Sequence, residues 1–403
     1  MKVLFVNCVY EKGSTGKIVR DLQKGLEELG IATVVCYGRG KNVSKENVYK
    51  TCGELESYAS HFFSKLNGLR YGGNPISTKR LEWIIEKEKP DIVHLHCLNG
   101  YFLNIYRFIV WLKRHDIKTV LTLHAEFMYT GNCGIAYDCD RWRTGCGSCP
   151  RLKQKTGISF LDRTSESWKR MKSAFEGFGK LKVVAVSDWI RQRAGQSPVL
   201  NRADISCIHN GIDIQNFTSI GKQNEREYLE QKYGIPGNKR IILHVTPGFD
   251  NSVKGGDFFI KIAERLPQEY QAVIVGCNEK VSDAVISIAF TNNQADLAAV
   301  YRAADVFAMT SRMDNYPTVC VEANCCGTPI VGFDVGGVAE TIGTGMGEVV
   351  PAFDLDAFYK KVIFWSEKKH EISTHTISER RKYCDRSRMT EDYLNLYRQF
   401  ECQ

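Results

Sequence analysis

The chain has 403 residues, more than one hydrophobic core normally organises, so we expect about two domains. Hydrophobic residues make up 43% and charged residues 25%, which is typical of a folded globular protein, and no apolar run of about 18 residues predicts a membrane span. The net charge of +8 indicates binding to phosphorylated ligands, to an anionic membrane or to nucleic acid, or it serves solubility alone. Because the sequence has no helix-turn-helix or RNA-binding motif, binding to nucleic acid is disfavoured.

Short apolar segments rich in Val and Ile alternate with amphipathic helical patterns along the chain. Strand-like segments of the first half are residues 2–9, 31–38, 91–97, 117–124 and 181–187. The pattern restarts with strand-like segments at residues 239–246, 270–276, 305–311 and 328–333. Helical patterns between strands include residues 15–30, 255–266 and 297–304. This alternation predicts an α/β protein with parallel sheets covered by helices on both faces.

We place a first domain at residues 1–200, a second at 205–375 and a C-terminal tail at 376–403 that ends in an amphipathic helix. This helix can pack across either domain. In open parallel sheets, ligands bind at the carboxyl ends of the strands, so residues directly after strands are the candidates for a site. The first apolar segment predicts a buried strand and not a signal peptide, because Glu11 and Lys12 follow it at once. We therefore expect a reducing cytoplasm and mostly reduced cysteines.

Glycines and histidines follow the strands of the first domain. Gly13 and Gly16 lie in a short loop that is not a P-loop, since Glu11 occupies the position of the first required glycine. The loop either lets the backbone approach a ligand or is a plain tight turn. His94, His96 and His124 lie at strand ends, where a histidine either contacts a ligand or packs in the core. The absence of a nearby carboxylate argues against a hydrolytic zinc site.

Four of the fifteen cysteines lie in the polar loop 131–150. They are Cys133, Cys139, Cys146 and Cys149. Four thiolates suit a closed tetrahedral zinc site that orders a loop too polar to fold by packing, so we hypothesise a structural zinc ion. One or two disulfides and free thiols remain alternatives. We also hypothesise that Arg141, Trp142 and Arg143 contact an acceptor phosphate or the membrane surface.

The segment "SRMDNYPTVCVEANCC" places Asp314 in a loop and Glu322 in the helix that follows Pro317. The amides of Tyr316, Thr318 and Val319 at this helix start form a predicted anion site. Glu322 can accept hydrogen bonds from both hydroxyls of a ribose. Judged on chemistry alone, Asp314 can equally be a helix cap and Glu322 a solvated side chain.

This segment resembles the donor site of the family 4 retaining glycosyltransferases. Its shared features are two acids separated by seven residues, a Gly-x-Pro turn and a Gly-Gly turn, here Asp314, Glu322, Gly327–Pro329 and Gly336–Gly337. The Asp-Asn pair in place of the usual Glu resembles a subgroup of exopolysaccharide and colanic-acid-type enzymes. The resemblance implies the GT-B fold, in which an acceptor-side and a donor-side Rossmann-like domain face an interdomain cleft. It also implies that the tail crosses to the N-terminal domain.

The resemblance further implies a nucleotide-diphosphate sugar as donor and a saccharide or lipid-linked saccharide as acceptor. Asp314 would hold the donor sugar, His124 would contact it, and Lys254 would meet the diphosphate. Glu322 would bind the ribose. The remaining residues assigned to donor binding are Gly13, Gly16, Asn315, Tyr316, Thr318, Val319 and Glu340. The resemblance thus implies a hexosyl or N-acetylhexosaminyl transferase that acts in bacterial surface polysaccharide synthesis. We expect it in the cytoplasm, with peripheral association at the anionic inner membrane.

The chain departs from the family at one place. Family members usually have a phosphate-binding arginine at a position that is occupied here by Pro247 or Gly248. Arg312 is a candidate replacement for this arginine. The missing arginine keeps a non-catalytic nucleotide-sugar-binding subunit open as an alternative. A sugar-nucleotide epimerase of the same fold is a further alternative, although it requires additional acids. No aspartate–aspartate metal motif is found, so we expect activity without a catalytic divalent ion.

Overall fold

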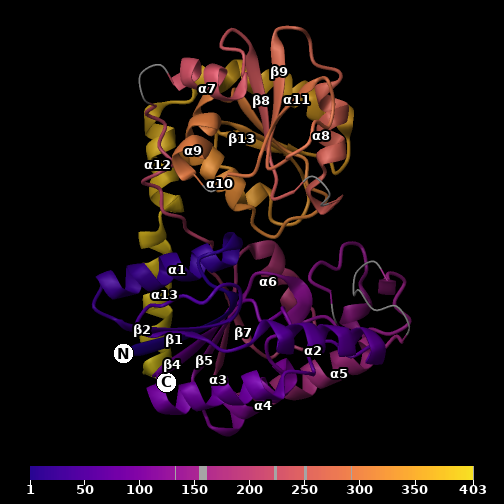
Figure 1. The fold of residues 1–403 in the computed structure, drawn as a ribbon, viewed down its shortest axis with the longest axis vertical. Coiled ribbons are helices and arrows are strands. Elements are labelled where there is room, and N and C mark those ends of the chain that lie inside the picture. The colour runs from indigo at the N-terminus through magenta and orange to yellow at the C-terminus, as the bar shows by residue number, and fades with distance from the viewer. Residues whose placement is uncertain (132, 154–160, 222–224, 249–251, 292, 403) are drawn as a thin grey trace. The chain divides into compact units, whose positions relative to one another are not determined.

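The structure, a computed structural model, describes residues 1–131, 133–153, 161–221, 225–248, 252–291 and 293–402. The chain divides into two compact units, as Figure 1 shows by colour along the chain. Unit 1 comprises Met1–His209 and Met389–Gln403, and unit 2 comprises Asn210–Arg388. Each unit contains one parallel sheet with helices, which confirms the α/β class predicted from the sequence.

The sheet of unit 1 has the strand order β3-β2-β1-β4-β5-β6-β7. Its strands are β1 (Lys2–Val9), β2 (Ala32–Arg39), β3 (Val48–Lys50), β4 (Ile92–Leu95), β5 (Thr119–Leu123), β6 (Leu181–Ala185) and β7 (Asp204–Cys207). All neighbouring strands run parallel, with Val3 opposite both Thr33 and Ile92. The order of the strands reverses between β1 and β4, and such a switch point opens a crevice at the carboxyl ends of the strands.

Helices cover the sheet of unit 1 on both faces. They are α1 (Gly13–Glu28), α2 (Glu54–Asn67), α3 (Pro75–Glu88), α4 (Ile105–Arg114), α5 (Thr164–Phe175), α6 (Asp188–Gly195) and α13 (Arg386–Glu401), with the short 3-10 helices η1 (Glu126–Met128) and η2 (Arg141–Arg143). The last helix, yellow in Figure 1, returns to unit 1, where Met389, Tyr393 and Tyr397 join a buried cluster with Phe5 and Val120. This matches the prediction that the C-terminal helix packs back on the N-terminal domain.

The sheet of unit 2 has the order β10-β9-β8-β11-β12-β13. Its strands are β8 (Arg240–Val245), β9 (Tyr270–Val275), β10 (Val285–Ile288), β11 (Val306–Met309), β12 (Ile330–Phe333) and β13 (Gly347–Val350). Its helices are α7 (Glu225–Tyr233), α8 (Gly256–Ala263), α9 (Gln294–Ala303), α10 (Thr318–Cys325), α11 (Leu355–Lys368) and α12 (Thr374–Cys384), with the 3-10 helices η4 (Ser252–Lys254), η5 (Ala339–Thr341) and η6 (Lys369–Glu371). The strand order reverses between β8 and β11, so the crevice of this sheet lies where these two strands end.

In the part of the chain that the structure describes, no helix combines the length and the apolar composition that crossing a membrane requires.

Candidate active site

Lys254 and Asp314 meet at the switch point of the sheet in unit 2. Lys254 ends η4, which follows β8, and Asp314 lies in the loop after β11. The Lys254 Nζ is 2.6 Å from the Asp314 Oδ2, and the two side chains are 27% and 14% exposed. This partial burial leaves a cation and a carboxylate paired at the point where the topology predicts ligand binding.

Backbone contacts hold the loops that carry these two residues together. The Arg312 N–H donates to the Val253 carbonyl at 2.8 Å, and the Thr310 hydroxyl donates to the Gly255 carbonyl at 2.9 Å. The loop after β8 is therefore pinned to the loop after β11 on both sides of Lys254. This arrangement explains why residues 60 positions apart in sequence form an ion pair.

A glycine turn fixes the backbone of Asp314. The Gly337 N–H donates to the Asp314 carbonyl at 2.9 Å. Gly336 has φ +61°, and a Cβ at this position would lie 2.0 Å from the same carbonyl oxygen. Only glycine tolerates both the left-handed backbone and this close approach. The Gly-Gly turn identified in the sequence thus acts directly on the position of Asp314.

Arg312, the candidate replacement for the missing phosphate-binding arginine, pairs with Asp257 in this structure. Its Nη1 donates to Asp257 Oδ1 at 2.7 Å and its Nη2 to Asp257 Oδ2 at 2.6 Å. Nη1 also donates to the Ser252 carbonyl at 2.7 Å, and the guanidinium lies 4.3 Å from the centre of the Phe258 ring. The same guanidinium lowers the pKa of Asp257 below its usual range. In this structure Arg312 therefore ties the β8–α8 loop to the start of α8.

Glu322 lies on α10 and is held by Tyr301, a residue that the sequence did not single out. The Tyr301 hydroxyl donates to the Glu322 Oε2 at 3.0 Å. Tyr301 is fully buried, and burial raises its pKa well above the usual value, so the phenol keeps its proton and remains a donor. This contact fixes one carboxylate oxygen and orients the other.

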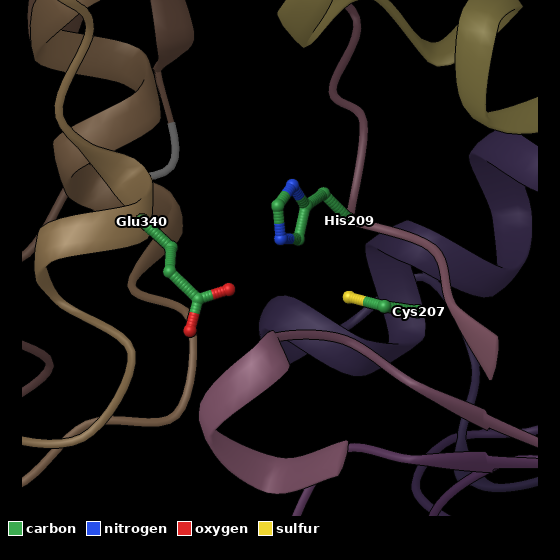
Figure 2. Close-up of side chains that lie close together, drawn as sticks. All are labelled: Cys207, His209 and Glu340. Carbon is green, nitrogen blue, oxygen red and sulfur yellow. The ribbon is translucent and has the colours of Figure 1, made fainter. Parts of the chain in front are cut away.

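The remaining predicted donor-binding residues of unit 2 lie around the start of α10 and on η5. Pro317 is the N-cap of α10, so Thr318 and Val319 lie in the first turn, where backbone N–H groups have no acceptor within the helix. Asn315 and Tyr316 directly precede the cap, and Tyr316 is buried. Glu340 lies on η5 (Figure 2) and is half-buried.

Gly13 and Gly16 lie at the carboxyl end of β1, at the switch point of the sheet in unit 1. Gly13 is the first residue of α1 and has φ +63°. A Cβ on Gly16 would lie 3.2 Å from the Glu11 backbone nitrogen and 3.3 Å from the Val9 side chain, so the loop packs closely on the first turn of the helix. The loop forms the tight turn that the sequence left open, and it brings the backbone of α1 to the strand end.

His96 and His124 contact each other where β4 and β5 end. The His96 Nδ1 lies 3.0 Å from the His124 Nε2, and the two rings stack with their centres 5.3 Å apart. Burial lowers the pKa of His124 to about 4 and that of His96 well below its usual value, with His94 and His124 adding to the shift of His96. Both imidazoles are therefore neutral at pH 7, and one donates a hydrogen bond to the other.

His94 packs in the core and does not face a ligand crevice. Its Nε2 lies 2.7 Å from the Thr122 hydroxyl, and its Nδ1 lies 2.6 Å from the Tyr397 hydroxyl. Thr122 in turn contacts the Tyr393 hydroxyl at 2.9 Å. Both ring nitrogens of the fully buried His94 thus have partners, one on β5 and one on α13. Of the two alternatives given for this histidine, the structure favours packing in the core over contact with a ligand.

All four cysteines of the loop 131–150, described apart from residue 132, line one small cavity. All four are free thiols, and burial raises the pKa of Cys133 to about 12, with the other three thiols adding to the shift. The hypothesis that Trp142 contacts an acceptor or a membrane is wrong, because its side chain is only 1% exposed. The Arg141 Nη1 donates to the carbonyls of Gly147 and Ser148 within the loop.

Cys207 and His209 lie close together where the first segment of unit 1 ends (Figure 2). Cys207 ends β7, and its sulfur lies within 4.8 Å of a ring nitrogen of His209. The sequence analysis did not single out either residue for chemistry, because a lone Cys-x-His carries no specific signal.

Comparison with known proteins identifies the family. The model described as "Glycosyltransferase Family 4" matches residues 15–216, and "Glycosyl transferases group 1" matches residues 225–383. The chain belongs to the family 4 glycosyltransferases. The first match covers Gly16 and the histidines of unit 1, and Gly13 lies just before it. The second match covers Lys254, Asp314 and Glu322.

A similar relative spans almost the whole chain. It is the putative colanic acid biosynthesis glycosyl transferase WcaC of Escherichia coli K12, 23% identical over 98% of this chain and 99% of the relative. A D-inositol 3-phosphate glycosyltransferase of Mycobacteroides abscessus is 29% identical over 54% of this chain and 51% of its own length. The match to WcaC agrees with the resemblance to colanic-acid-type enzymes.

Solved structures identify the fold as GT-B. Sucrose-phosphate synthase from Thermosynechococcus elongatus matches with a TM-score of 0.71 at 17% identity, covering 99% of this chain and 98% of that protein. Anabaena Alr3699/HepE in complex with UDP-glucose matches with a TM-score of 0.69 at 16% identity, covering 98% of this chain and 99% of that protein. These structures confirm two Rossmann-like domains as the architecture of this glycosyltransferase.

Proposed function

We propose that this glycosyltransferase moves a hexose or N-acetylhexosamine from a nucleotide-diphosphate sugar to a saccharide or lipid-linked saccharide, with retention of anomeric configuration. The observation that carries the proposal is the ion pair of Lys254 and Asp314 beside the start of α10, at the switch point of the sheet in unit 2. The similarity to WcaC supports a role in surface polysaccharide synthesis, and the UDP-glucose complex of HepE supports a nucleotide-sugar donor.

Lys254 is proposed to stabilise the leaving diphosphate. The ammonium group has three N–H donors, of which one is directed to Asp314, so the others remain able to bind phosphate oxygens. The first amides of α10 add positive potential on the same side. Negative charge grows on the diphosphate as the sugar leaves, and groups already fixed in place stabilise that charge without reorganising.

Asp314 is proposed to hold the donor sugar. Its Oδ2 binds Lys254, whereas Oδ1 can accept a hydrogen bond from a sugar hydroxyl. Glu322 is proposed to accept from the ribose hydroxyls through the oxygen that Tyr301 does not bind. The family resemblance assigns His124 to the donor sugar, and a neutral imidazole suits a hydroxyl group as its partner.

Retention follows if the acceptor hydroxyl attacks from the face that the diphosphate leaves. The bond between the anomeric carbon and the phosphate oxygen breaks, the bond to the acceptor oxygen forms, and the acceptor proton passes to the departing phosphate oxygen. The products are a nucleoside diphosphate and a new glycoside with unchanged anomeric configuration. This scheme requires no nucleophilic side chain, and it makes the fixed cation Lys254 the main catalytic contribution of unit 2.

A thermal-shift screen with UDP-, GDP-, ADP- and TDP-sugars tests the donor. One of these sugars is expected to raise the unfolding temperature of the wild-type protein, and Lys254→Ala is expected to lose that rise. Product analysis by NMR then reports whether the new glycoside keeps the anomeric configuration of the donor. An inverted product would contradict the retaining mechanism, and no stabilisation by any of the four would contradict the donor class.

A second candidate is a non-catalytic nucleotide-sugar-binding subunit. The observation that favours it is the pairing of Arg312 with Asp257, which engages the candidate replacement for the missing phosphate-binding arginine. The two candidates differ in turnover. Calorimetric binding of a nucleotide sugar, together with no transfer from the radiolabelled donor to a bacterial lipid extract, would favour the binding subunit over the enzyme.

The proposed acceptor lies at an anionic membrane, and helix α2 offers a surface for it. Five large apolar side chains of α2 are exposed: Leu55, Tyr58, Phe62, Phe63 and Leu66, by 86%, 61%, 59%, 60% and 48%. Four of them follow the spacing of one helical face. A patch of this kind on an isolated helix face is typical of an interfacial helix that inserts into a membrane surface.

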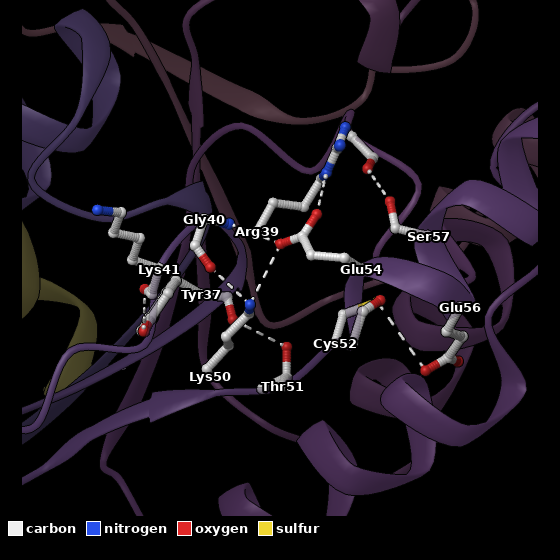
Figure 3. A network of polar contacts seen from close by, with 12 residues as sticks. Tyr37, Arg39, Gly40, Lys41, Lys50, Thr51, Cys52, Glu54, Glu56 and Ser57 are labelled. Carbon is white, nitrogen blue, oxygen red and sulfur yellow. Dashed lines mark hydrogen bonds and ion pairs between the residues drawn. The ribbon is translucent and has the colours of Figure 1, made fainter.

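The charges around α2 favour an anionic bilayer as the occupant. Glu54 contacts Lys50 at 3.2 Å and Arg39 at 3.6 Å, so the acid at the start of the helix is neutralised, as Figure 3 shows. Glu56 accepts from the backbone N–H and the hydroxyl of Ser77 and is thereby held by α3. Arg39, Lys50 and Lys65 exceed Glu54 and Glu56 by one positive charge, which complements acidic lipid head groups.

Vesicle sedimentation tests this surface. The double variant Phe62→Ser/Phe63→Ser is expected to bind phosphatidylglycerol vesicles at least tenfold more weakly than the wild type. Phe364→Ser is the matched control, because it removes a 45% exposed phenylalanine from α11 in unit 2. Equal vesicle binding by both variants, or a concentration-dependent dimer that the double variant abolishes, would contradict membrane docking through α2.

A further inference from the structure

Within the described residues of the loop 131–150, which leave out residue 132, regular secondary structure is almost absent. Apart from the short helix η2, this part of the loop consists of turns, and the four consecutive residues Gly145, Cys146, Gly147 and Ser148 have positive φ angles of 142°, 52°, 104° and 45°. Cys146 and Ser148 are not glycine, so this Cys-x-x-Cys turn carries an energetic cost. An additional interaction is needed to maintain it.

The four cysteines of this loop line a common cavity. Cys133, Cys139, Cys146 and Cys149 line a cavity of about 20 Å³, which has room for about one water-sized sphere and therefore for one metal ion. Within the described residues, no three of these sulfur atoms lie within 4.8 Å of one another. Binding of one ion at about 2.3 Å from each sulfur would therefore draw the four sulfur atoms closer together.

Backbone groups around the cavity are arranged to stabilise thiolates. The Gly131 N–H donates to the Cys146 sulfur, and the Arg151 N–H donates to the Cys149 sulfur. The Arg141 guanidinium holds the turn between these two cysteines by donating to the Gly147 and Ser148 carbonyls at 3.0 and 2.6 Å. Hydrogen bonds of this kind fix the ligands of a metal ion in position.

The wall of the cavity is rigid and connects to β5. Trp142 lines the cavity, its indole donates to the Cys139 carbonyl at 2.8 Å, and the Trp168 indole donates to the Trp142 carbonyl at 2.8 Å. The buried Glu126 accepts from the Ala136 N–H at 2.5 Å and pairs with Arg193 at 2.7 Å. Glu126 is two residues from His124, so the order of the loop bears directly on the segment that carries this histidine.

We propose that Cys133, Cys139, Cys146 and Cys149 bind one structural zinc ion, which orders the segment after β5. Four sulfur ligands from half-buried cysteines match the coordination of structural zinc, and they leave no open position for catalysis. The Zn²⁺ ion also offsets half of the negative charge of four thiolates, which would otherwise repel one another in a confined space. The site is independent of the donor site in unit 2, so its test does not depend on glycosyl transfer.

Metal analysis of the purified full-length protein tests the proposal. Mass spectrometry of the metals is expected to find about one zinc per chain, and Cys146→Ser/Cys149→Ser is expected to lose it together with a lower unfolding temperature. Cys207→Ser and Cys402→Ser remove thiols outside the loop and are expected to keep the zinc. Substitution by cobalt(II) gives a readout that needs no variant, because a tetrahedral tetrathiolate site produces strong visible absorption bands.

Three results would overturn the proposal. In the first, the wild-type protein contains no metal, and a thiol assay finds four thiols fewer than the fifteen cysteines of the chain. This result would indicate two disulfides. Another is iron in place of zinc, which contradicts the choice of metal. The third is zinc that Cys207→Ser removes and the Cys146/Cys149 double variant retains, because this places the ion elsewhere.

Discussion

The carboxyl edges of the two sheets have the same topology and different chemistry. In unit 1, the switch point between β1 and β4 carries a glycine loop and the neutral pair His96–His124. In unit 2, the switch point between β8 and β11 carries the ion pair Lys254–Asp314. The fold supplies a crevice in both units, and the residues at its edge decide what it can bind. A neutral imidazole pair suits sugar hydroxyls, whereas a cation paired with a carboxylate suits a diphosphate and its sugar.

Removing either member of the charged pair in unit 2 is expected to have the largest effect on glycosyl transfer. Asp314→Ala and Lys254→Ala are each expected to lower the transfer rate about 10²–10³-fold, the usual effect of losing one preorganised electrostatic group. Steady-state transfer of a radiolabelled sugar measures the effect. Lys361→Ala is the matched control, because it breaks the ion pair with Glu348 in the same unit at 3.0 Å and is expected to leave transfer unchanged. Near-normal rates in both site variants would refute the assignment.

The Gly-Gly turn offers a smaller perturbation of the same pair. Gly336→Ala is expected to lower transfer about tenfold and to destabilise the protein by about 1–3 kcal/mol, because its Cβ would displace the Asp314 carbonyl. Gly345→Ala is the control, since Gly345 has a similar φ of +73° and nothing within 4 Å of its Cβ. Kinetics and thermal unfolding of the two variants should differ. Equal losses would show that backbone strain alone explains the effect.

Tyr301 sharpens the role of Glu322. Tyr301→Phe removes the hydroxyl that orients the carboxylate and is expected to weaken donor binding about fivefold, the usual contribution of one hydrogen bond of about 1 kcal/mol. The effect is expected in KM for the donor and not in kcat, because the ribose is distant from the reacting bond. Tyr233→Phe removes a hydroxyl that binds Asp296 and serves as control. A lower kcat with unchanged KM would contradict the ribose role.

Acid titration tests the neutral edge of unit 1. The pKa of His124 in the folded protein is lowered to about 4, below the usual value of 6.5, so the unfolded chain binds protons more readily than the folded one between these values. The free energy of unfolding is therefore expected to fall as the pH drops from about 6.5 to 4, and to be retained above 6.5. Urea unfolding across this range measures it. His124→Gln should show a shallower pH dependence, and an unchanged slope would contradict the neutral state.

The sequence predicted the central strands of both sheets and missed the edges. The four strands without a strand-like signal are β3, β7, β10 and β13, and these are the outermost strands of the two sheets. Central strands such as β4 and β11 are buried along their whole length and therefore form Val- and Ile-rich runs. Edge strands such as β7 are partly exposed, so their composition resembles that of loops.

The placement of the candidate site residues was predictable where local sequence carries the chemistry. The positions of Asp314, Glu322 and Lys254 followed from turn residues and from the family resemblance. The packing of His94 against Tyr397 was not predictable, because 303 residues separate them. The same holds for Tyr301, whose contact with Glu322 depends on how α9 packs against α10. Such partners are set by the tertiary fold and leave no periodic signal in the chain.

Calorimetric titration of the donor tests the central claim most directly. Wild-type protein, Lys254→Ala, Asp314→Ala and Lys361→Ala would each be titrated with UDP-, GDP-, ADP- and TDP-glucose. We expect one of these nucleotide sugars to bind the wild type and Lys361→Ala equally, and to bind each site variant at least tenfold more weakly. Equal affinity of that nucleotide sugar for all four proteins would contradict the account, because the diphosphate would then bind without the paired cation and carboxylate.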